Sequence, residues 1–404
     1  MNQPDSTAHP PLMGLAALIR LSFEGQDLRP LAKRFLQRAQ DDPTDANALM
    51  DLATTLELNL QPEVGLGVQA QALQMCAHYC VLKPANARLR VLCLMAPGDL
   101  STNAPLAFLL EDSDVALDML FVGEGVAPVA SLPEHDVLFC AIGESEATHP
   151  LLDRLKPIMD TWPRPVLNPP ERVMRTSRDG AHALLHDAPG IIMPPSRRLE
   201  RADLECLGRS ELTLETLLPG ERFPVLVRPV DSHAGHDLAK LHSAEEIAAY
   251  LEPLKETRFF LSPFVDYRDA DGQFRKYRVV LIDGRAYAGH MAISSHWMIH
   301  YLNAGMRESA EKRTEEARFM QNFETDFARR HAAAFEAINQ RLALDYLVID
   351  CAETTTGELL IFEVDTGAVV HSMDPPDLFP YKLPAMHKVF DAFRALLAKA
   401  AAEN

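Results

Sequence analysis

Three carboxylates stand at the end of a strongly apolar hairpin near the C-terminus. The first apolar run ends in Asp350, and the second carries Glu363 and Asp365. With a turn centred on residues 356 and 357, Asp350 lies directly opposite Glu363, and Asp365 points to the same face. Like charges facing one another raise the pKa of at least one carboxyl group unless something compensates. Mg²⁺ is the natural compensation for such oxygen ligands, and it brings substrate phosphates with it. A solvated acidic strand end is the alternative.

A second hairpin, over residues 274–294, carries two cations on one face. Asp283-Gly284 is a strong hairpin-turn signal. The register that follows from this turn places Lys276 and Arg278 side by side and puts Gly289 opposite Arg278, which leaves space over the guanidinium group. Two cations with room above them suit a polyphosphate. A solvated basic strand is the alternative.

Two further segments could contact a nucleotide. The apolar strand 223–230 carries a cation near its end and leads into a loop of small residues, whose backbone N–H groups can approach phosphate oxygens. The apolar segment 258–266 could offer backbone groups to a purine and a carboxylate to a ribose, although such a segment is more often an ordinary core strand. The candidate residues of the first segment are Arg228, Ser232, His233, Ala234 and Gly235, and those of the second are Leu261, Ser262, Pro263, Phe264 and Asp266.

A histidine-rich segment follows the basic hairpin. Its side chains could bind a substrate or relay a proton, and a packed aromatic helix or loop is the alternative. The candidate substrate residues are His290, His296, His300 and Asn303.

The elements that must position these residues fall into four expected segments. Residues 1–85 contain only helical periodicity and resemble tetratricopeptide-type hairpins, which serve either as a surface for a protein partner or for self-association, or as a packing appendage. Residues 86–195 alternate strands and helices, as in a small parallel α/β domain. Residues 196–258 and 259–404 read as two α+β subdomains with antiparallel strands.

Composition narrows the class of protein. The 57 acidic and 39 basic residues give a formal net charge of −18, which argues against a general nucleic-acid binder. No apolar run is long enough for a membrane helix, and the polar start of the chain is not a signal peptide. Six cysteines in 404 residues do not make a disulfide framework, so we expect a cytoplasmic protein.

The order of the elements resembles the ATP-grasp superfamily, with the glutathione synthetase and ribosomal-protein-glutamylating ligases as the nearest types. The likeness covers roughly residues 90–395 and rests on a cation-ended strand with a small loop, an apolar hinge strand, a basic hairpin and an acidic hairpin, in that sequence. It implies ATP held between two subdomains, with adenine on residues 261–264. The implied phosphate ligands are Arg178, Arg228, the 232–235 loop and Arg278, and the implied ligands of Mg²⁺, or of Mn²⁺ in its place, are Asp350, Glu363 and Asp365.

This chain departs from the ATP-grasp pattern at three positions. The family commonly has lysine where Arg228 stands and another lysine near Arg178. Its last metal ligand is usually asparagine, where this chain has Asp365. Arginine binds phosphate with a different geometry from lysine, so these changes would alter affinity, metal choice or activity.

The resemblance implies an ADP-forming ligase that joins a small carboxylate or a peptide terminus to an amine or another nucleophile. Lys276 and Arg278 would act on the transferred phosphoryl group, and the histidine segment would form the acceptor side. Two alternatives remain open: a nucleotide-binding scaffold that recruits partners through residues 12–85, and a small-molecule kinase. A homodimer is also left open.

Overall fold

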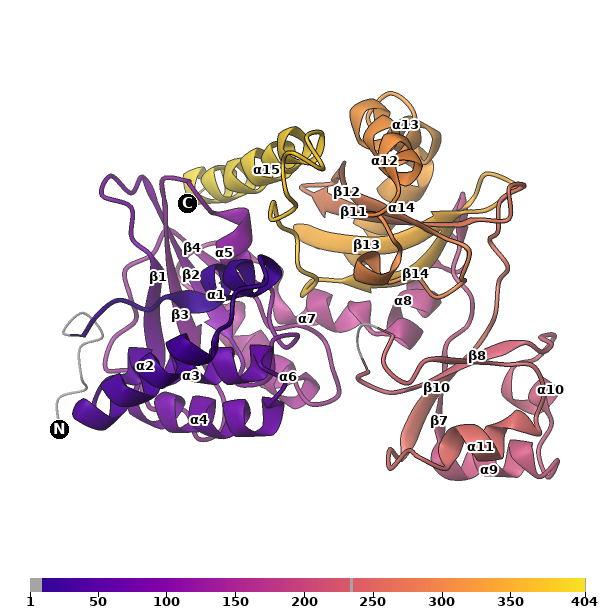
Figure 1. Cartoon of the computed structure of the whole chain (residues 1–404), viewed down its shortest axis with the longest axis horizontal. Helices are drawn as coiled ribbons and strands as arrows, with labels where there is room; N and C mark the ends of the chain where they lie inside the picture. The colour runs from indigo at the N-terminus through magenta and orange to yellow at the C-terminus, as the bar shows by residue number, and fades with distance from the viewer. Residues whose placement is uncertain (1–8, 233–234, 404) are drawn as a thin grey trace. The chain divides into compact units, whose positions relative to one another are not determined.

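The computed structural model describes residues 9–232 and 235–403. The chain divides into two compact units. The first contains residues up to 174 together with 344–347 and 365 onward, and the second contains residues 175–343 and 348–364. Both are built from helices and mixed sheets, so the expected α/β and α+β class is confirmed (Figure 1).

The first unit is organised around a five-stranded sheet with the order β1-β3-β2-β4-β5. Four strands are parallel, as expected for a small α/β domain, and β1 is an antiparallel edge strand. The strands are β1 (His78–Leu82), β2 (Leu89–Met95), β3 (Val115–Phe121), β4 (Val137–Cys140) and β5 (Val166–Leu167).

Strand β1 contradicts the expectation that residues 12–85 form helices only. Tyr79 is completely buried and packs edge-on against Phe121, while its neighbours His78 and Cys80 are only partly buried. This alternation of burial is that of a strand with one face in the core. The helical part therefore ends at Met75.

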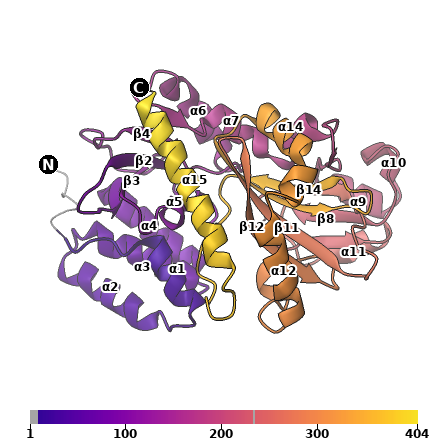
Figure 2. The ribbon, with the colours of Figure 1, turned by 90° about the horizontal axis from the view of Figure 1, so that it is seen from above.

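The helices of the first unit include an N-terminal group and a long C-terminal helix. In the N-terminal group, α3 contacts α1, α2 and α4, whereas α15 packs on β2, β4 and α5 (Figures 1 and 2). The helices are α1 (Gly14–Phe23), α2 (Arg29–Asp41), α3 (Ala46–Leu58), α4 (Pro62–Met75), α5 (Leu106–Leu109), α6 (His149–Met159), α7 (Pro170–Val173) and α15 (Lys382–Ala402). The short 3₁₀ turn η2 (Met174–Thr176) follows α7.

The N-terminal helices share a core with the rest of the first unit. Ala16 of α1 packs with Phe108 and Met373, and the backbone N–H groups of Met13 and Gly14 donate to the buried carboxylate of Asp51. The expected helical character of this region is confirmed, and its likeness to tetratricopeptide hairpins stays a prediction. These contacts tie α1 to both α3 and the C-terminal segment.

We expect deletion of residues 1–85 to prevent folding of the remaining chain. The deletion removes the edge strand β1 and uncovers Phe108 and Phe121, which are almost fully buried. Size-exclusion chromatography and near-ultraviolet circular dichroism of the truncated chain test this expectation. A folded, monomeric truncated chain would show instead that the helices are a separable module.

Glu57 of α3 gives the first unit a pH-dependent stability. Burial, with Asp99 adding to it, raises the pKa of Glu57 to about 7, against about 4.3 in an unfolded chain. A raised carboxyl pKa means that stability is fully present at low pH and is lost as the pH rises toward 7. We therefore expect Glu57→Gln to stabilise the protein by about 1 to 2 kcal/mol at pH 8 and to change little at pH 4. Thermal melts at both pH values check this, with exposed Glu63→Gln as the control; equal effects at both pH values would contradict it.

The second unit contains a four-stranded antiparallel sheet, in the order β7-β10-β8-β9. Alternate residues of its strands, among them Val225, Val227, Phe259 and Leu261, form a core with α9 and α11. The elements are β7 (Arg197–Glu200), α9 (Arg201–Gly208), α10 (Leu214–Leu217), β8 (Val225–Pro229), β9 (Ala239–Leu241), α11 (Glu246–Leu251) and β10 (Arg258–Pro263).

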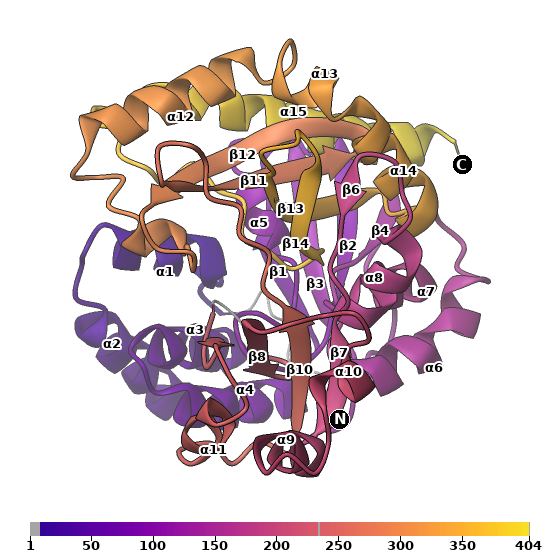
Figure 3. The same cartoon turned by 90° about the vertical axis from the view of Figure 1, so that its right-hand side faces the viewer.

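A five-stranded sheet, β12-β11-β13-β14-β6, makes up the rest of the second unit. Helix α12 packs on β12, and Phe319 and Phe327 contact Tyr277 of β11, so helices cover one face of this sheet (Figure 3). The strands are β6 (Ile191–Ile192), β11 (Phe274–Ile282), β12 (Arg285–Ser294), β13 (Tyr346–Glu353) and β14 (Leu359–Asp365). The helices are α8 (Arg178–Leu185), η3 (Tyr301–Asn303), α12 (Ala310–Asn322), α13 (Phe327–Arg330) and α14 (Ala332–Leu342).

The boundary between the units differs from the expected boundary at residue 195. It falls after Met174, because β6 pairs in parallel with β14 and thereby ties residues 175–195 to the second unit. The C-terminal segment from Asp365 onward belongs to the first unit instead of following the preceding strands. Phe393 of α15 explains this placement, since it packs against Phe139 and Tyr346.

No helix in the described part of the chain is both long and apolar enough to cross a membrane.

Candidate functional site

Arg228 lies on the face of the four-stranded sheet that points away from the core. Val225 and Val227 of β8 face α9 and α11, so the alternation of a strand turns Arg228 to the other face, where Phe260 is its cross-strand partner. Its Nε donates to Ser232 Oγ over 2.9 Å, and Nη2 donates to the Ser232 carbonyl oxygen. Arg228 therefore holds the start of the small-residue loop.

Lys276 and Arg278 converge on one carboxylate. They share the face of β11 that the helices leave open, and both contact Asp350 on the neighbouring strand β13. Arg278 Nε and Nη2 donate to the two Asp350 oxygens over 2.8 and 2.9 Å, and Lys276 Nζ lies 2.7 Å from Oδ2. The side chain of Asp350 is only 9% exposed. The predicted common face of the two cations is confirmed.

The register around Arg278 differs from the expected register by one residue. Its cross-strand partner is His290 instead of Gly289, and Lys276 faces Ala292. Gly289 is the extra residue of a bulge, and a Cβ atom there would lie 2.9 Å from the carbonyl oxygen of Arg278 and 3.0 Å from its Cγ. The expectation of open space above the guanidinium is wrong, because the stem of Arg278 itself fills that space. The predicted turn is confirmed, with Asp283 and Gly284 at φ +48° and +74°.

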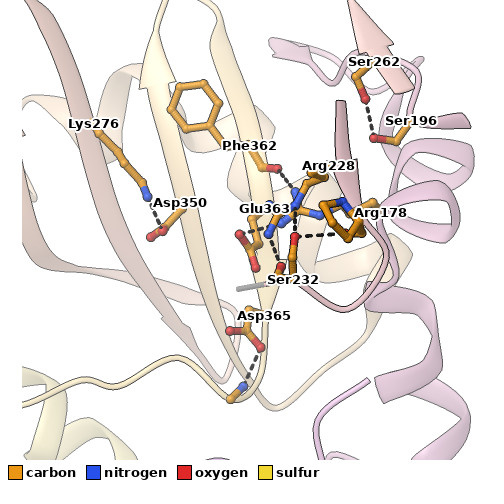
Figure 4. A network of polar contacts seen from close by, with 12 residues as sticks. Arg178, Ser196, Arg228, Ser232, Ser262, Lys276, Asp350, Phe362, Glu363 and Asp365 are labelled. Atoms are coloured by element: carbon orange, nitrogen blue, oxygen red, sulfur yellow. Dashed lines mark hydrogen bonds and ion pairs between the residues drawn. The ribbon is translucent and has the colours of Figure 1, made fainter. Parts of the chain in front are cut away.

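Glu363 on β14 is held by a different cation. Arg178, the first residue of α8, donates from Nη2 to Glu363 Oε2 over 2.9 Å and from Nη1 to the carbonyl oxygen of Phe362 over 3.1 Å (Figure 4). Arg228 also acts on Glu363, because Glu363 and Arg178 are both among the charges that shift the pKa of Arg228. The Glu363 side chain remains 34% exposed.

The cations reverse the expected electrostatics of the acidic hairpin. Burial alone would raise the pKa of Asp350, but Arg278 and Lys276 bring it well below its usual value. Burial likewise opposes ionisation of Glu363, and Arg178 and Arg228 outweigh it, so the pKa of Glu363 is lowered although Asp350 acts in the other direction. The expectation that crowding raises a carboxyl pKa in the absence of metal is wrong, because each carboxylate has its own counter-ions.

The turn between β13 and β14 is centred on residue 356, half a residue earlier than expected, which shifts the register at the turn by one residue. Thr354 donates its backbone N–H to Glu358, and Gly357 donates to Thr354, each over 2.9 Å, with Gly357 at φ +84°. Glycine supplies this left-handed residue without strain. The direct pairing of Asp350 with Glu363 stays a prediction.

Asp365 belongs to the first compact unit, whereas Glu363 belongs to the second. Its Oδ1 accepts the backbone N–H of Gly367 over 2.7 Å. Its role as a third metal ligand stays a prediction.

Burial lowers the pKa of Arg228 to about 10, and the charge of Arg178 adds to this effect. Two neighbouring guanidinium groups repel one another, so this part of the site favours an added anion.

Of the predicted loop residues, Ser232 contacts Arg228 and Gly235 lies against Met298. His233 and Ala234 lie outside the described residues.

The predicted hinge shows a contact that sequence reasoning missed. Leu261 and Pro263 are buried, Ser262 hydrogen-bonds Ser196 over 2.7 Å, and Lys240 Nζ lies 3.4 Å from the centre of the Phe264 ring. Lys240 is the cross-strand partner of Leu226 on β8, so it shares a face with Arg228. The alternation of the short strand β9 is the only sequence signal that could have indicated it.

Asp266 is the hinge residue that the structure does not bring into this group. Asp266 is exposed, and both of its carboxylate oxygens accept hydrogen bonds from Arg268 on the same loop. A role at a ribose would require this pair to open.

Only some residues of the histidine-rich segment are associated with Lys276 and Arg278. His290 lies opposite Arg278 and against the ring of Tyr301. Burial, with the charges of Lys276 and Arg278, lowers the pKa of His300. His296 is exposed, and Asn303 accepts the backbone N–H of His300.

The carboxylates suit a magnesium ion in chemistry but form no ready cluster. Within the described ranges, no three histidine, cysteine, aspartate or glutamate side chains are grouped so as to hold a metal. Magnesium takes one or two protein carboxylates and completes its shell with water and substrate phosphates. Asp350 and Glu363 fit that pattern, provided that each shares or exchanges its present counter-ions.

Comparison with known proteins gives structural likenesses only. No family model matches the chain, and no curated protein matches it in sequence. Among solved structures, the D-Ala:D-Ser ligase VanG from Enterococcus faecalis is similar over 76% of this chain and 99% of its own, with 16% identity and a TM-score of 0.48. D-alanyl-alanine synthetase A from Vibrio cholerae is similar over 79% of this chain and 100% of its own, with 14% identity and a TM-score of 0.49. A RimK domain ATP-grasp protein from Sphaerobacter thermophilus is similar over 76% of this chain and 99% of its own, with 14% identity and a TM-score of 0.40. With scores this low, the assignment of function depends on the residues of this chain.

Proposed function

We propose that this chain is an ATP- and Mg²⁺-dependent ligase of the ATP-grasp superfamily, of the glutathione synthetase and ribosomal-protein-glutamylating type. It would join a small carboxylate or a peptide terminus to an amine or another nucleophile and release ADP and phosphate. The observation that carries the proposal is the ion-pair network of the second unit. Four cations from three separate elements, α8, β8 and β11, surround two carboxylates on adjacent strands, in the chain order that the resemblance requires. The cations are Arg178, Arg228, Lys276 and Arg278.

The four cations supply binding and charge neutralisation for a polyphosphate. Phosphoryl transfer needs little covalent chemistry from the protein, so positioning and electrostatics account for most of the catalysis. Arg228 and Arg178 would take the phosphates on the side of the small-residue loop, and Lys276 and Arg278 on the side of β11. A guanidinium group offers two parallel donors to phosphate, which fixes orientation as well as charge.

Asp350 and Glu363 would hold Mg²⁺. When bound, that ion would supply positive charge to neutralise the charge that develops on the phosphate. A substrate carboxylate would attack the terminal phosphorus of ATP, giving an acyl phosphate and releasing ADP. The second substrate's nucleophile would then attack the acyl carbon and displace phosphate. His290 is the cross-strand partner of Arg278, and the charges of Lys276 and Arg278 lower the pKa of His300, so these two histidines are the residues suited to hold the acceptor or to carry its proton.

Release of ADP and inorganic phosphate from the full-length protein tests this function. The protein is incubated with ATP and Mg²⁺ together with pooled amino acids, small carboxylates or peptides, and both products are measured. A ligase releases equal amounts of ADP and phosphate, and only when the right pool is present. ADP with a stable phosphorylated product identifies a kinase instead, and binding without any release identifies a nucleotide-binding scaffold. The absence of both a thermal shift and binding heat at millimolar ATP and Mg²⁺ would overturn the whole assignment.

A further inference from the structure

The residues of the site carry an excess of positive charge. Two carboxylates face four cations, and both carboxylates are engaged: Asp350 by Lys276 and Arg278, and Glu363 by Arg178. Adding a divalent cation to Glu363 would place two more positive charges beside Arg178 and Arg228. Repulsion of this kind is strong where water is partly excluded. The same surroundings attract an anion.

Arg178 is held more firmly than a lone surface ion pair. One guanidinium nitrogen binds Glu363 Oε2 and another binds the carbonyl oxygen of Phe362, the preceding residue of the same strand. Its side chain is 22% exposed, whereas that of Glu363 is 34% exposed. Arg178 is also the first residue of α8, whose N-terminus is fixed by a hydrogen bond from Gly180 to Ser177. A shorter lysine at this position would offer one charged nitrogen and could not make both contacts in this fork.

We propose that Arg178 is a counter-ion latch on Glu363, which competes with divalent cations for this carboxylate and releases it when a polyphosphate draws the guanidinium away. The latch rests on the proposed function, since it concerns the same nucleotide and metal. It makes the binding of the two ligands mutually reinforcing: the anion frees Glu363 for the cation, and the cation on Glu363 frees Arg178 for the anion. Such coupling is reciprocal by thermodynamic necessity.

The latch predicts a gain of metal binding when Arg178 loses its charge. Full-length, metal-stripped protein is titrated with Mn²⁺ alone, without nucleotide, and free Mn²⁺ is followed by electron paramagnetic resonance. We expect the unaltered protein to bind Mn²⁺ weakly and Arg178→Gln to bind it at least about tenfold more tightly, a change of one pairing interaction. Arg178→Lys, which keeps the charge but not the fork, should fall between the two.

Two further variants locate the gain. Glu363→Gln combined with Arg178→Gln should abolish it, because the freed carboxylate is then absent. Arg285→Gln is the matched control, since it also separates an arginine from a single glutamate, Glu324, at an exposed position outside the network. This control should leave Mn²⁺ binding unchanged.

ATP affinity provides the reciprocal measurement. In the unaltered protein, ATP should bind more tightly with Mn²⁺ than in chelator, by a larger factor than in Arg178→Gln, after correction for complex formation in solution. Equal Mn²⁺ affinity in the unaltered protein and Arg178→Gln, or a gain that survives Glu363→Gln, would overturn the latch. Failure of the unaltered protein to bind ATP with or without metal would overturn the proposed function, while the titration with Mn²⁺ alone would still decide whether Arg178 guards Glu363. Should Arg178→Gln not fold, Arg178→Lys carries the same comparison.

Discussion

Replacing Glu363 by glutamine should lower ATP-dependent product formation by about 100-fold or more, while the fold is retained. The substitution keeps the shape of the side chain and removes the charge that the proposed metal requires; loss of a group that supports a metal or its ligands has effects of about this size. Initial rates of ADP and phosphate release, measured at saturating ATP and Mg²⁺, give the comparison. Glu358→Gln, at the turn of the same hairpin, is the matched control and should keep normal rates.

The same substitution should also destabilise the metal-free protein by about 1 kcal/mol, the loss of one charge-assisted hydrogen bond at a partly exposed site. Considered alone, the three carboxylates suggest the opposite sign, because removing one of several like charges relieves repulsion. Arg178 and Arg228 decide the sign, since glutamine leaves their charges without a counter-ion. Chemical denaturation in chelator measures it. Near-normal turnover of Glu363→Gln would require the metal assignment and the ligase mechanism to be abandoned.

Replacing Arg278 by alanine should have the second large effect, on both stability and nucleotide binding. Asp350 is almost fully buried and would keep only Lys276 as a counter-ion. Breaking a buried ion pair from one side costs about 3 kcal/mol. The ATP-induced rise in melting temperature should also become much smaller, because a ligand stabilises the fold in proportion to its binding to the native state.

The loss of stability in Arg278→Ala should depend on pH in a defined direction. The pKa of Asp350 lies well below its usual value in the folded protein. A lowered carboxyl pKa contributes stability above the unfolded pKa of about 3.9, and this contribution is lost as the pH falls through the folded pKa. The difference between the two proteins should therefore be largest near neutral pH and shrink below about pH 4.

Arg275→Ala is the control for this prediction. Arg275 lies three residues earlier on β11 and binds Asp271 and Glu315 of α12, on the side of the sheet that the helices cover. Its loss should lower stability without reducing the shift that ATP induces beyond the change in the starting melting temperature. An unchanged ATP-induced shift in Arg278→Ala would remove Arg278 from the phosphate site.

Local patterns in the sequence were sufficient for most strands and for the common face of two cations. The Asp-Gly turn at 283–284 needs two residues with positive φ, and few residue types adopt that conformation without strain, so the hairpin and the pairing of Lys276 with Arg278 on one face follow from local chemistry. The strands that end in Asp350 and carry Glu363 follow in the same way from their apolar runs. Residues 78–82 were missed because a five-residue edge strand, next to an N-terminal region of helices, has too short a pattern for its period to be recognised.

The tertiary structure alone decided which charges meet. Arg178 is 185 residues from Glu363 in the chain, and Arg278 is 72 residues from Asp350, so nothing in either local pattern pairs them. The bulge at Gly289 shifted the register of a hairpin whose turn was correctly predicted, because one unpaired residue changes every partner beyond it. The sequence by itself determined that acidic and basic strands exist and that Lys276 and Arg278 share a face. Only folding determined that each carboxylate is neutralised by its own cations, because ionisation depends on which charges lie within a few ångströms, and that is a property of the packed sheets.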